Sequence, residues 1–209
     1  MTDFSRQPLS DFLDALASDA PTPGGGTAAA VAGGMGAALA EMVAALTLSK
    51  EKYAASHAAV RPIAEEAKNA RAEFARLAEE DSQAYDEVIA ARRLPKETEE
   101  EKAGRARRVA AANRLAAEVP MRTARAGVGL LRLLPELAEK ANPNAASDAG
   151  SAALLLDAAI RAALLNVGIN LSGIADSAVV GEMQRETADL QEEAGRLTDR
   201  VLAAVRRTF

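Results

Sequence analysis

The sequence predicts an all-α fold, an antiparallel bundle of roughly six long helices. No segment alternates apolar and polar residues with a period of two, whereas long stretches carry apolar residues three and four positions apart. The breaks between these stretches are short and contain Pro, Gly or Asn, so consecutive helices are expected to run antiparallel. Hydrophobic residues make up 49% of the chain but aromatic residues only 3%, which favours close packing of alanine-rich helices and a subunit interface.

The first half of the chain contains three expected helices, which cover about residues 11–18, 27–48 and 57–92. Ser10 is a suitable N-cap for the first helix. The segment Pro21-Thr22-Pro23-Gly24-Gly25-Gly26 ends it and leads into the second, which is rich in Ala and Gly. The third is amphipathic and ends before Leu94-Pro95, because a proline disfavours the helical conformation of the residue before it.

The second half begins with Thr98, which is followed by three glutamates that suit the first turn of a helix. Pro120 either kinks this helix or begins another that reaches residue 140. The Asn142-Pro143-Asn144 segment is a strong turn signal. The last two expected helices cover about residues 146–174 and 177–207.

The composition argues against several functional classes. The net charge is −5 with both signs mixed along the chain, so no nucleic-acid partner is expected. The chain has no cysteine and one histidine, which excludes thiolate chemistry and argues against a metal site. Residues 1–11 carry Asp3 and Arg6 and lack an apolar signal core, so we expect one cytoplasmic domain over residues 1–209. Residues 24–48 contain Glu41 and lack preceding basic residues, so no membrane span is expected.

The glycine run before the second helix is the most informative local feature. Glycine lets a backbone come close to another group, and the N–H groups of the first helical turn at Thr27 lack partners within the helix. Gly24, Gly25, Gly26 and Thr27 therefore form a candidate anion-binding site. The alternative is that these glycines let two helices pack closely.

Asp81 lies on the apolar side of the third helix. At about 100° per residue, Asp81 falls about 20° from Phe74. The same stripe contains Val60, Ile63, Ala67, Ala70, Phe74, Leu77, Tyr85 and Val88. A buried carboxylate tends to have a raised pKa, which suits an acid/base catalyst. The alternative is a structural Asp81 that bonds to Tyr85 or caps a neighbouring helix.

A second set of polar residues lies on the helix after the Asn-Pro-Asn turn. Asp148, Asn166 and Asn170 share one side of it, because eighteen residues make about five whole turns. Asp157 and Arg161 are expected to form an ion pair on the other side. The amides of Asn166 and Asn170 either bond to a facing helix or bind a heterocycle.

Four segments of this chain together resemble one known family. They are Pro23-Gly24-Gly25-Gly26-Thr27-Ala28-Ala29, Asp81-Ser82-Gln83-Ala84-Tyr85, Leu94-Pro95-Lys96 and Asn166-Val167-Gly168-Ile169-Asn170-Leu171. In order and spacing they are similar to the cyclodeaminase domain of formiminotransferase-cyclodeaminase, and to stand-alone bacterial methenyltetrahydrofolate cyclohydrolases. The resemblance implies an all-helical homodimer that acts on tetrahydrofolate derivatives without a metal. No formiminotransferase half is present, so a separate formiminotransferase is a possible partner.

The resemblance also assigns roles to residues. The catalytic aspartate of the family falls on Asp81, and its folate-site loop on Gly24, Gly25 and Gly26. Glu79 stands where relatives often have Asp, but the helical phase points it away from Asp81. The remaining candidates for substrate binding are Thr27, Lys50, Tyr85, Asn144, Asp148, Asn166 and Asn170, with Arg92 and Lys96 as weaker candidates for the anionic glutamate tail.

Two reactions fit this signature. In the cyclodeaminase reaction, N10 of 5-formiminotetrahydrofolate attacks the formimino carbon, ammonia leaves and the 5,10-methenyl bridge forms. In the cyclohydrolase reaction, water opens that bridge to give 10-formyltetrahydrofolate. Both need a group that moves a proton near a cationic carbon, and Asp81 is expected to do this. The rival hypothesis is a non-catalytic all-α module that dimerises through its alanine-rich faces.

Overall fold

The computed structural model describes residues 7–208, in which helices are joined by turns and no strand occurs. The seven α-helices in that range are α1 (Leu9–Leu16), α2 (Gly25–Leu48), α3 (Ala54–Arg92), α4 (Glu99–Leu131), α5 (Leu134–Lys140), α6 (Ala146–Leu171) and α7 (Ser177–Arg206). The all-α prediction is confirmed. Asp3 and Arg6, on which the expectation of no leader sequence rests, lie outside the described residues.

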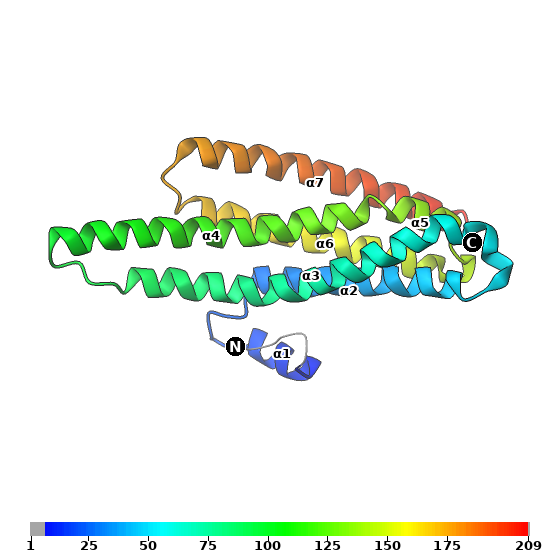
Figure 1. Ribbon diagram of the computed structural model, residues 1–209, viewed down its shortest axis with the longest axis horizontal. Helices are drawn as coiled ribbons and strands as arrows, with labels where there is room; N and C mark the ends of the chain where they lie inside the picture. The colour runs from blue at the N-terminus through cyan, green and yellow to red at the C-terminus, as the bar shows by residue number, and fades with distance from the viewer. Residues whose placement is uncertain (1–6, 209) are drawn as a thin grey trace.

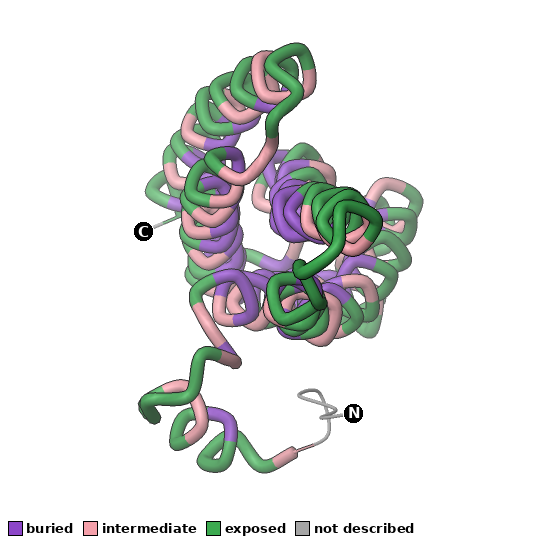
Figure 2. The backbone as a smooth tube through the Cα atoms, turned by 90° about the vertical axis from the view of Figure 1, so that its left-hand side faces the viewer, coloured by how far each residue is buried: buried purple, intermediate pink, exposed green. Residues whose placement is uncertain are grey.

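The helices form an elongated bundle in which α2 packs between α3 and α6, and α4 packs against both α3 and α6 (Figure 1). Helix α7 lies along α6 and also contacts α4 and α5. Helix α1 stands outside the bundle in both views (Figures 1 and 2). Helix α2 runs antiparallel to α3 and α6, so its N-terminus lies at the same end of the bundle as the C-termini of α3 and α6 (Figure 1).

Glycines in α2 let larger side chains of the neighbouring helices come close. A Cβ atom on Gly33 would lie 2.5 Å from the ring of Phe74, and one on Gly36 would lie 2.9 Å from Cγ of Leu156. Both neighbours are fully buried. For this part of α2, the close-packing role of small residues is the one that the structure shows.

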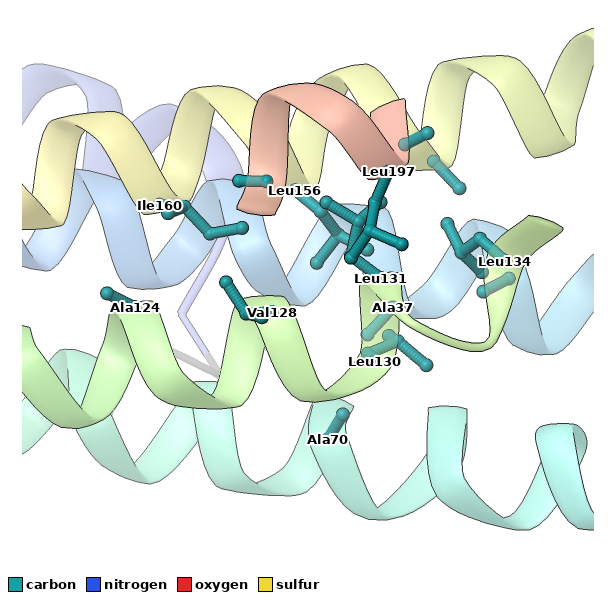
Figure 3. Close-up of a cluster of buried hydrophobic side chains, with 14 of the residues drawn as sticks. Ala37, Ala70, Ala124, Val128, Leu130, Leu131, Leu134, Leu156, Ile160 and Leu197 are labelled. Carbon is teal, nitrogen blue, oxygen red and sulfur yellow. The ribbon is translucent and has the colours of Figure 1, made fainter. Parts of the chain in front are cut away.

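The main core is built from aliphatic side chains of α2 to α7 that point toward one another (Figure 3). In α3, the predicted stripe is buried from Val60 to Leu77 and again at Val88. Tyr85 differs, since its side chain is 40% exposed. The reason is that α3 borders a cavity at this level, and Tyr85 lines that cavity.

Helix α4 begins with a capping box, in which the Thr98 hydroxyl accepts from the Glu101 N–H and the Glu101 carboxylate accepts from the Thr98 N–H. It continues through Pro120 and ends at Leu131, just before Pro135 of α5. Pro120 has no N–H, so the carbonyl of Ala116, four residues earlier, lacks its usual partner within the helix. The Ala116 carbonyl instead accepts a hydrogen bond from a side chain of α6.

Two segments, Gly25–Leu48 and Pro143–Leu171, are long and apolar enough to cross a bilayer by length and composition alone. In each, 44% of the most apolar window is buried inside the bundle. A core helix of a soluble protein passes the same test, so this is weak evidence for a membrane span. The expectation that residues 24–48 do not span a membrane stays a prediction, and the second segment was not singled out by the sequence.

Candidate active site

A cavity of about 440 Å³ lies where the N-terminus of α2 meets the C-terminal parts of α3 and α6. This volume is within the range of small-molecule sites, about 300–1,000 Å³. The predicted site residues that line it are Gly24, Gly25, Gly26, Asp81, Tyr85, Asn166 and Asn170, together with the weaker candidate Arg92. The fold thus brings together residues that are up to about 145 positions apart in the sequence.

Asp81 takes the place of a side-chain cap at the N-terminus of α2. The N-cap residue of α2 is Gly24, which has no side chain to offer. Instead, the Thr27 hydroxyl donates to Oδ2 of Asp81 over 2.9 Å, and the Thr27 main-chain N–H also bonds to this carboxylate. Both alternatives for Asp81 are therefore realised at once, because it caps a neighbouring helix and lines the cavity. Tyr85, four residues on, makes no hydrogen bond to it among the described residues.

The glycine run gives this carboxylate its space. A Cβ atom on Gly26 would lie 2.2 Å from Oδ1 of Asp81, which is too close for any side chain. A Cβ atom on Gly25 would lie 3.2 Å from Nδ2 of Asn166. The backbone of α2 can approach the polar groups of α3 and α6 because these two positions are glycine. Part of the predicted anion site is thus already occupied by the carboxylate of Asp81.

Two opposing effects act on the pKa of Asp81. Burial raises its pKa, because the ionised form is poorly solvated, while the hydroxyl and N–H of Thr27 lower it. Burial is the larger effect, so the pKa is raised overall. A raised pKa makes the protonated form of a carboxyl group more accessible, which is a property of acid/base catalysts.

Three asparagines line the same cavity, and each donates to a main-chain carbonyl. Nδ2 of Asn166 donates to the Ala162 carbonyl over 2.9 Å, and Nδ2 of Asn170 donates to the Ala116 carbonyl over 2.7 Å. Nδ2 of Asn113, on α4, donates to the Gly173 carbonyl over 2.7 Å. Asn113 is absent from the sequence-based candidates. In the sequence, Asn113 is an amide within an alanine-rich helix segment, and hydrophobic periodicity alone does not indicate that it faces α6.

Lys50, Asn144 and Asp148 lie at the opposite end of the bundle from this cavity. Lys50 directly follows the last turn of α2, whose 24 residues separate its two ends by about 36 Å. Asn144 and Asp148 are near that same end, because the neighbouring Asn142 donates its N–H to the Thr47 hydroxyl of α2 over 2.9 Å. The structure of one protomer therefore does not bring these three residues to Asp81.

The Asn-Pro-Asn turn has a structural network of its own. Oδ1 of the buried Asn142 accepts from the Tyr53 hydroxyl over 2.7 Å and from the Asn144 N–H over 3.1 Å. His57 is near this end as well, with Nε2 3.3 Å from the Lys50 carbonyl. On the other side of α6, the predicted ion pair between Asp157 and Arg161 forms at 2.8 Å.

A larger depression of about 890 Å³ runs between α6 and α7 and is lined by charged side chains such as Arg161, Glu192 and Arg196. It contains none of the predicted site residues. Within residues 7–208, no three His, Cys, Asp or Glu side chains lie together as a metal site would require. The expectation of metal-free chemistry stays a prediction.

Comparison with known proteins connects this site to one family. A family model described as formiminotransferase-cyclodeaminase matches residues 8–189. A methenyltetrahydrofolate cyclohydrolase from Methylorubrum extorquens is 42% identical over 96% of this chain and 97% of its own length. A formimidoyltransferase-cyclodeaminase from Sus scrofa is 32% identical over 90% of this chain, which corresponds to only 35% of that longer protein.

The crystal structure of a formiminotetrahydrofolate cyclodeaminase from Thermotoga maritima has the same fold, with a TM-score of 0.86 and 34% sequence identity. The superposition covers 97% of both chains. The family model spans most of the described residues, and the similarity to both stand-alone proteins is nearly full-length. The chain belongs to the formiminotransferase-cyclodeaminase family.

Proposed function

We propose that this protein is a folate one-carbon enzyme, a formiminotetrahydrofolate cyclodeaminase in which Asp81 is the general acid/base. The observation that carries the proposal is the carboxyl group of Asp81, which faces a ligand-sized cavity and has a raised pKa. The name of the structural neighbour from Thermotoga maritima supports the choice of reaction.

In the proposed reaction, the N10 lone pair attacks the formimino carbon attached to N5, which becomes tetrahedral. The carboxylate of Asp81 takes the proton from N10 and delivers it to the formimino nitrogen. With one further proton, this nitrogen leaves as ammonia, and the cationic 5,10-methenyl bridge remains. The negative charge of Asp81 stabilises the cation as it develops.

A second candidate is the cyclohydrolase reaction, which is favoured by the 42% identical relative of nearly equal length. Here water adds to the methenyl carbon and Asp81 takes one of its protons. The bond from that carbon to N5 breaks, N5 receives the proton and 10-formyltetrahydrofolate forms, with release of one proton overall. Asp81 and the cavity would serve both reactions, because both pass through a tetrahedral carbon between N5 and N10.

The remaining roles are part of the same proposal. Gly24, Gly25, Gly26 and Tyr85 border the reacting part of the folate, and the glutamate tail leaves past Arg92 at the cavity rim. Thr27 is fully buried outside the cavity lining and acts through its hydrogen bond to Asp81. Lys50, Asn144 and Asp148 can take part only through another protomer, because about 36 Å of helix separates them from Asp81. The reaction proceeds in the cytoplasm without a metal, and a separate formiminotransferase supplies the formimino substrate.

We also propose that the protein is a homodimer. Large apolar side chains are exposed on the neighbouring helices α2 and α6: Met35, Met42, Leu46, Leu154, Leu165 and Ile169. We call this set the α2/α6 apolar face. A surface of this kind on a chain with few aromatic residues is typical of a subunit interface.

The test is to add purified protein separately to 5-formiminotetrahydrofolate and to 5,10-methenyltetrahydrofolate and to follow the absorbance of the methenyl group. Appearance of the chromophore with release of ammonia from the first substrate identifies a cyclodeaminase. Loss of the chromophore from the second, faster than without enzyme, identifies a cyclohydrolase. If folded protein changes neither rate, the proposed function is wrong and a non-catalytic module becomes the better hypothesis.

A further inference from the structure

We infer that Pro120 is a positioning residue that sets the orientation of the Asn170 amide, although Pro120 itself lies outside the cavity lining. This orientation makes the side of the cavity formed by α4 and α6, the α4/α6 wall, a hydrogen-bond acceptor. This inference rests on the proposed function for the identity of the ligand. The contact between Pro120 and Asn170, through the carbonyl of Ala116, can be tested without it.

The first step is the carbonyl that Pro120 leaves free. In a regular helix the N–H of residue 120 would donate to the carbonyl of Ala116, but proline has no N–H and its ring crowds this carbonyl. Both residues are buried in α4, where water does not readily replace the missing donor. Nδ2 of Asn170, from α6, donates to the Ala116 carbonyl over 2.7 Å and takes that place.

The second step is the orientation of the amide. A carbonyl oxygen can only accept, so the amide of Asn170 must turn its nitrogen toward Ala116 and its oxygen away. The same argument applies to Asn166 beside the Ala162 carbonyl and to Asn113 beside the Gly173 carbonyl. Among the described residues, none donates to Oδ1 of any of these three asparagines.

The third step is the chemistry of the wall. The three asparagines line a cavity that Asp81 also lines, and because their Nδ2 atoms are bonded to main-chain carbonyls, their amide oxygens are the groups left to accept from a ligand. All four groups favour N–H donors or a delocalised cation on the ligand and disfavour a carbonyl edge. We therefore place the amino-pyrimidine edge of a pterin, which presents neighbouring N–H donors, against this wall, with Asn170 as one of its acceptors.

The variant that tests this is Pro120→Ala. It restores an N–H to α4, which competes with Asn170 for the Ala116 carbonyl, and the amide of Asn170 loses its fixed orientation. Loss of one hydrogen bond to the ligand corresponds to about a tenfold increase in KM. The value of kcat stays within about twofold, since binding of a distant ring edge acts equally on substrate and transition state.

The matched control is Pro62→Ala in α3. Pro62 is also inside a long helix, but it is exposed and no side chain among residues 7–208 donates to the carbonyl of Ala58, four residues earlier. This variant is expected to keep the wild-type KM. Thermal melting of both variants checks that they are folded.

Asn170→Ala and the double variant Pro120→Ala/Asn170→Ala complete a double-mutant cycle. If Pro120 acts through Asn170, the double variant has the KM of Asn170→Ala alone, so the two effects are not additive. In the ligand-free protein, the side-chain NH₂ signals of Asn170 in a ¹⁵N spectrum shift in Pro120→Ala and stay unchanged in Pro62→Ala.

The outcomes separate the two proposals. A wild-type protein that turns over neither folate refutes the proposed function, while the NMR comparison still reports on the contact. An active wild-type protein with an unchanged KM in Pro120→Ala, additive effects in the cycle, or unchanged Asn170 signals refutes the inference about Pro120.

Discussion

Asp81 has two functions in this structure. It supplies the side-chain cap that Gly24 cannot provide to α2, and it presents a carboxyl group with a raised pKa to the cavity. A cap favours the ionised form, whereas burial favours the neutral form. Burial is the larger effect, so the pKa of Asp81 is raised overall, although Thr27 opposes the shift.

Replacing Asp81 by Asn tests both consequences. Without the carboxyl group, turnover is expected to fall at least about 100-fold, the lower range for loss of an acid/base group. The stability of Asp81→Asn relative to wild type is expected to increase as the pH rises. The raised pKa means that wild-type protein loses stability as the pH increases through the pKa of folded Asp81, and Asn does not titrate. The melting temperature of Asp81→Asn relative to wild type should therefore increase between acidic and neutral pH, and a constant difference would contradict the raised pKa.

Thr27→Val tests the opposing effect on the pKa. The Thr27 hydroxyl lowers the pKa of Asp81, so its removal should raise that pKa further. The limb of the pH profile of kcat/KM that reports Asp81 is expected to move to higher pH. The control is Thr123→Val, because the Thr123 hydroxyl is also buried but bonds only to the Val119 carbonyl of its own helix. Equal profiles for the two variants would show that Thr27 has no influence on Asp81.

Gly26→Ala tests the space that the glycine run leaves for the carboxylate. The added Cβ would lie 2.2 Å from Oδ1 of Asp81, so either the carboxyl group or the first turn of α2 must move. Because a misplaced catalytic group is costly, we expect kcat to fall about 100-fold. Gly129→Ala is the matched control, since nothing lies within 4 Å of the Cβ it would add. Similar kcat values for both variants would mean that the position of Asp81 does not depend on Gly26.

At the scale of the elements, the two ends of α2 have separate functions. One end receives Asp81 and borders the cavity, and the other is held to the α5–α6 connection by Asn142, Thr47 and Tyr53. The length of α2 keeps them about 36 Å apart. A change at the second end is therefore expected to alter stability and leave the chemistry of a protomer intact.

Asn142→Ala makes this separation measurable. It leaves the part-buried Tyr53 hydroxyl and Asn144 N–H without their acceptor, which is expected to cost about 1–3 kcal/mol of unfolding free energy. Denaturant titration measures this loss, and kcat/KM of the remaining folded protein should equal that of wild type. Ser151→Ala, on the exposed surface of α6, is the control for a hydroxyl that bonds only to its own helix. A large loss of kcat/KM in Asn142→Ala would mean that the two ends are coupled.

At the scale of the whole molecule, the α2/α6 apolar face is adjacent to the cavity, because Ile169 belongs to both. If this face is the dimer interface, a charge placed in it should convert the dimer into monomers. Leu165→Glu is the sharpest choice, since this side chain is 76% exposed and lies outside the cavity lining. Light scattering after gel filtration measures the mass, and Leu115→Glu on α4 is the control. A wild-type monomer, or a dimer unaffected by Leu165→Glu, would rule out this interface.

The sequence by itself determined what depends on local interactions. Hydrophobic periodicity and the proline positions predicted the helices closely, and the Thr98 capping signal predicted the start of α4 at Glu99. The Ser10 capping signal was wrong, because α1 begins at Leu9 after the N-cap Pro8. The phase of α3 placed Asp81 among its apolar residues because each residue of a helix turns by about 100°. Residues 24–26, 81, 85, 166 and 170 were predicted to share a site largely through a resemblance to a known family, and the structure brings them together around one cavity.

Only the tertiary structure decided which groups face one another across helices. It shows that Gly26 makes room for Asp81, that Asn113 joins the cavity, and that Asn170 bonds to a carbonyl freed by Pro120. It also separates Lys50, Asn144 and Asp148 from Asp81, although Asp148 shares the helix face of Asn170. The physical reason is that the angular position of a residue is set by hydrogen bonds within its own helix, whereas its neighbours depend on how the helices are packed along their axes.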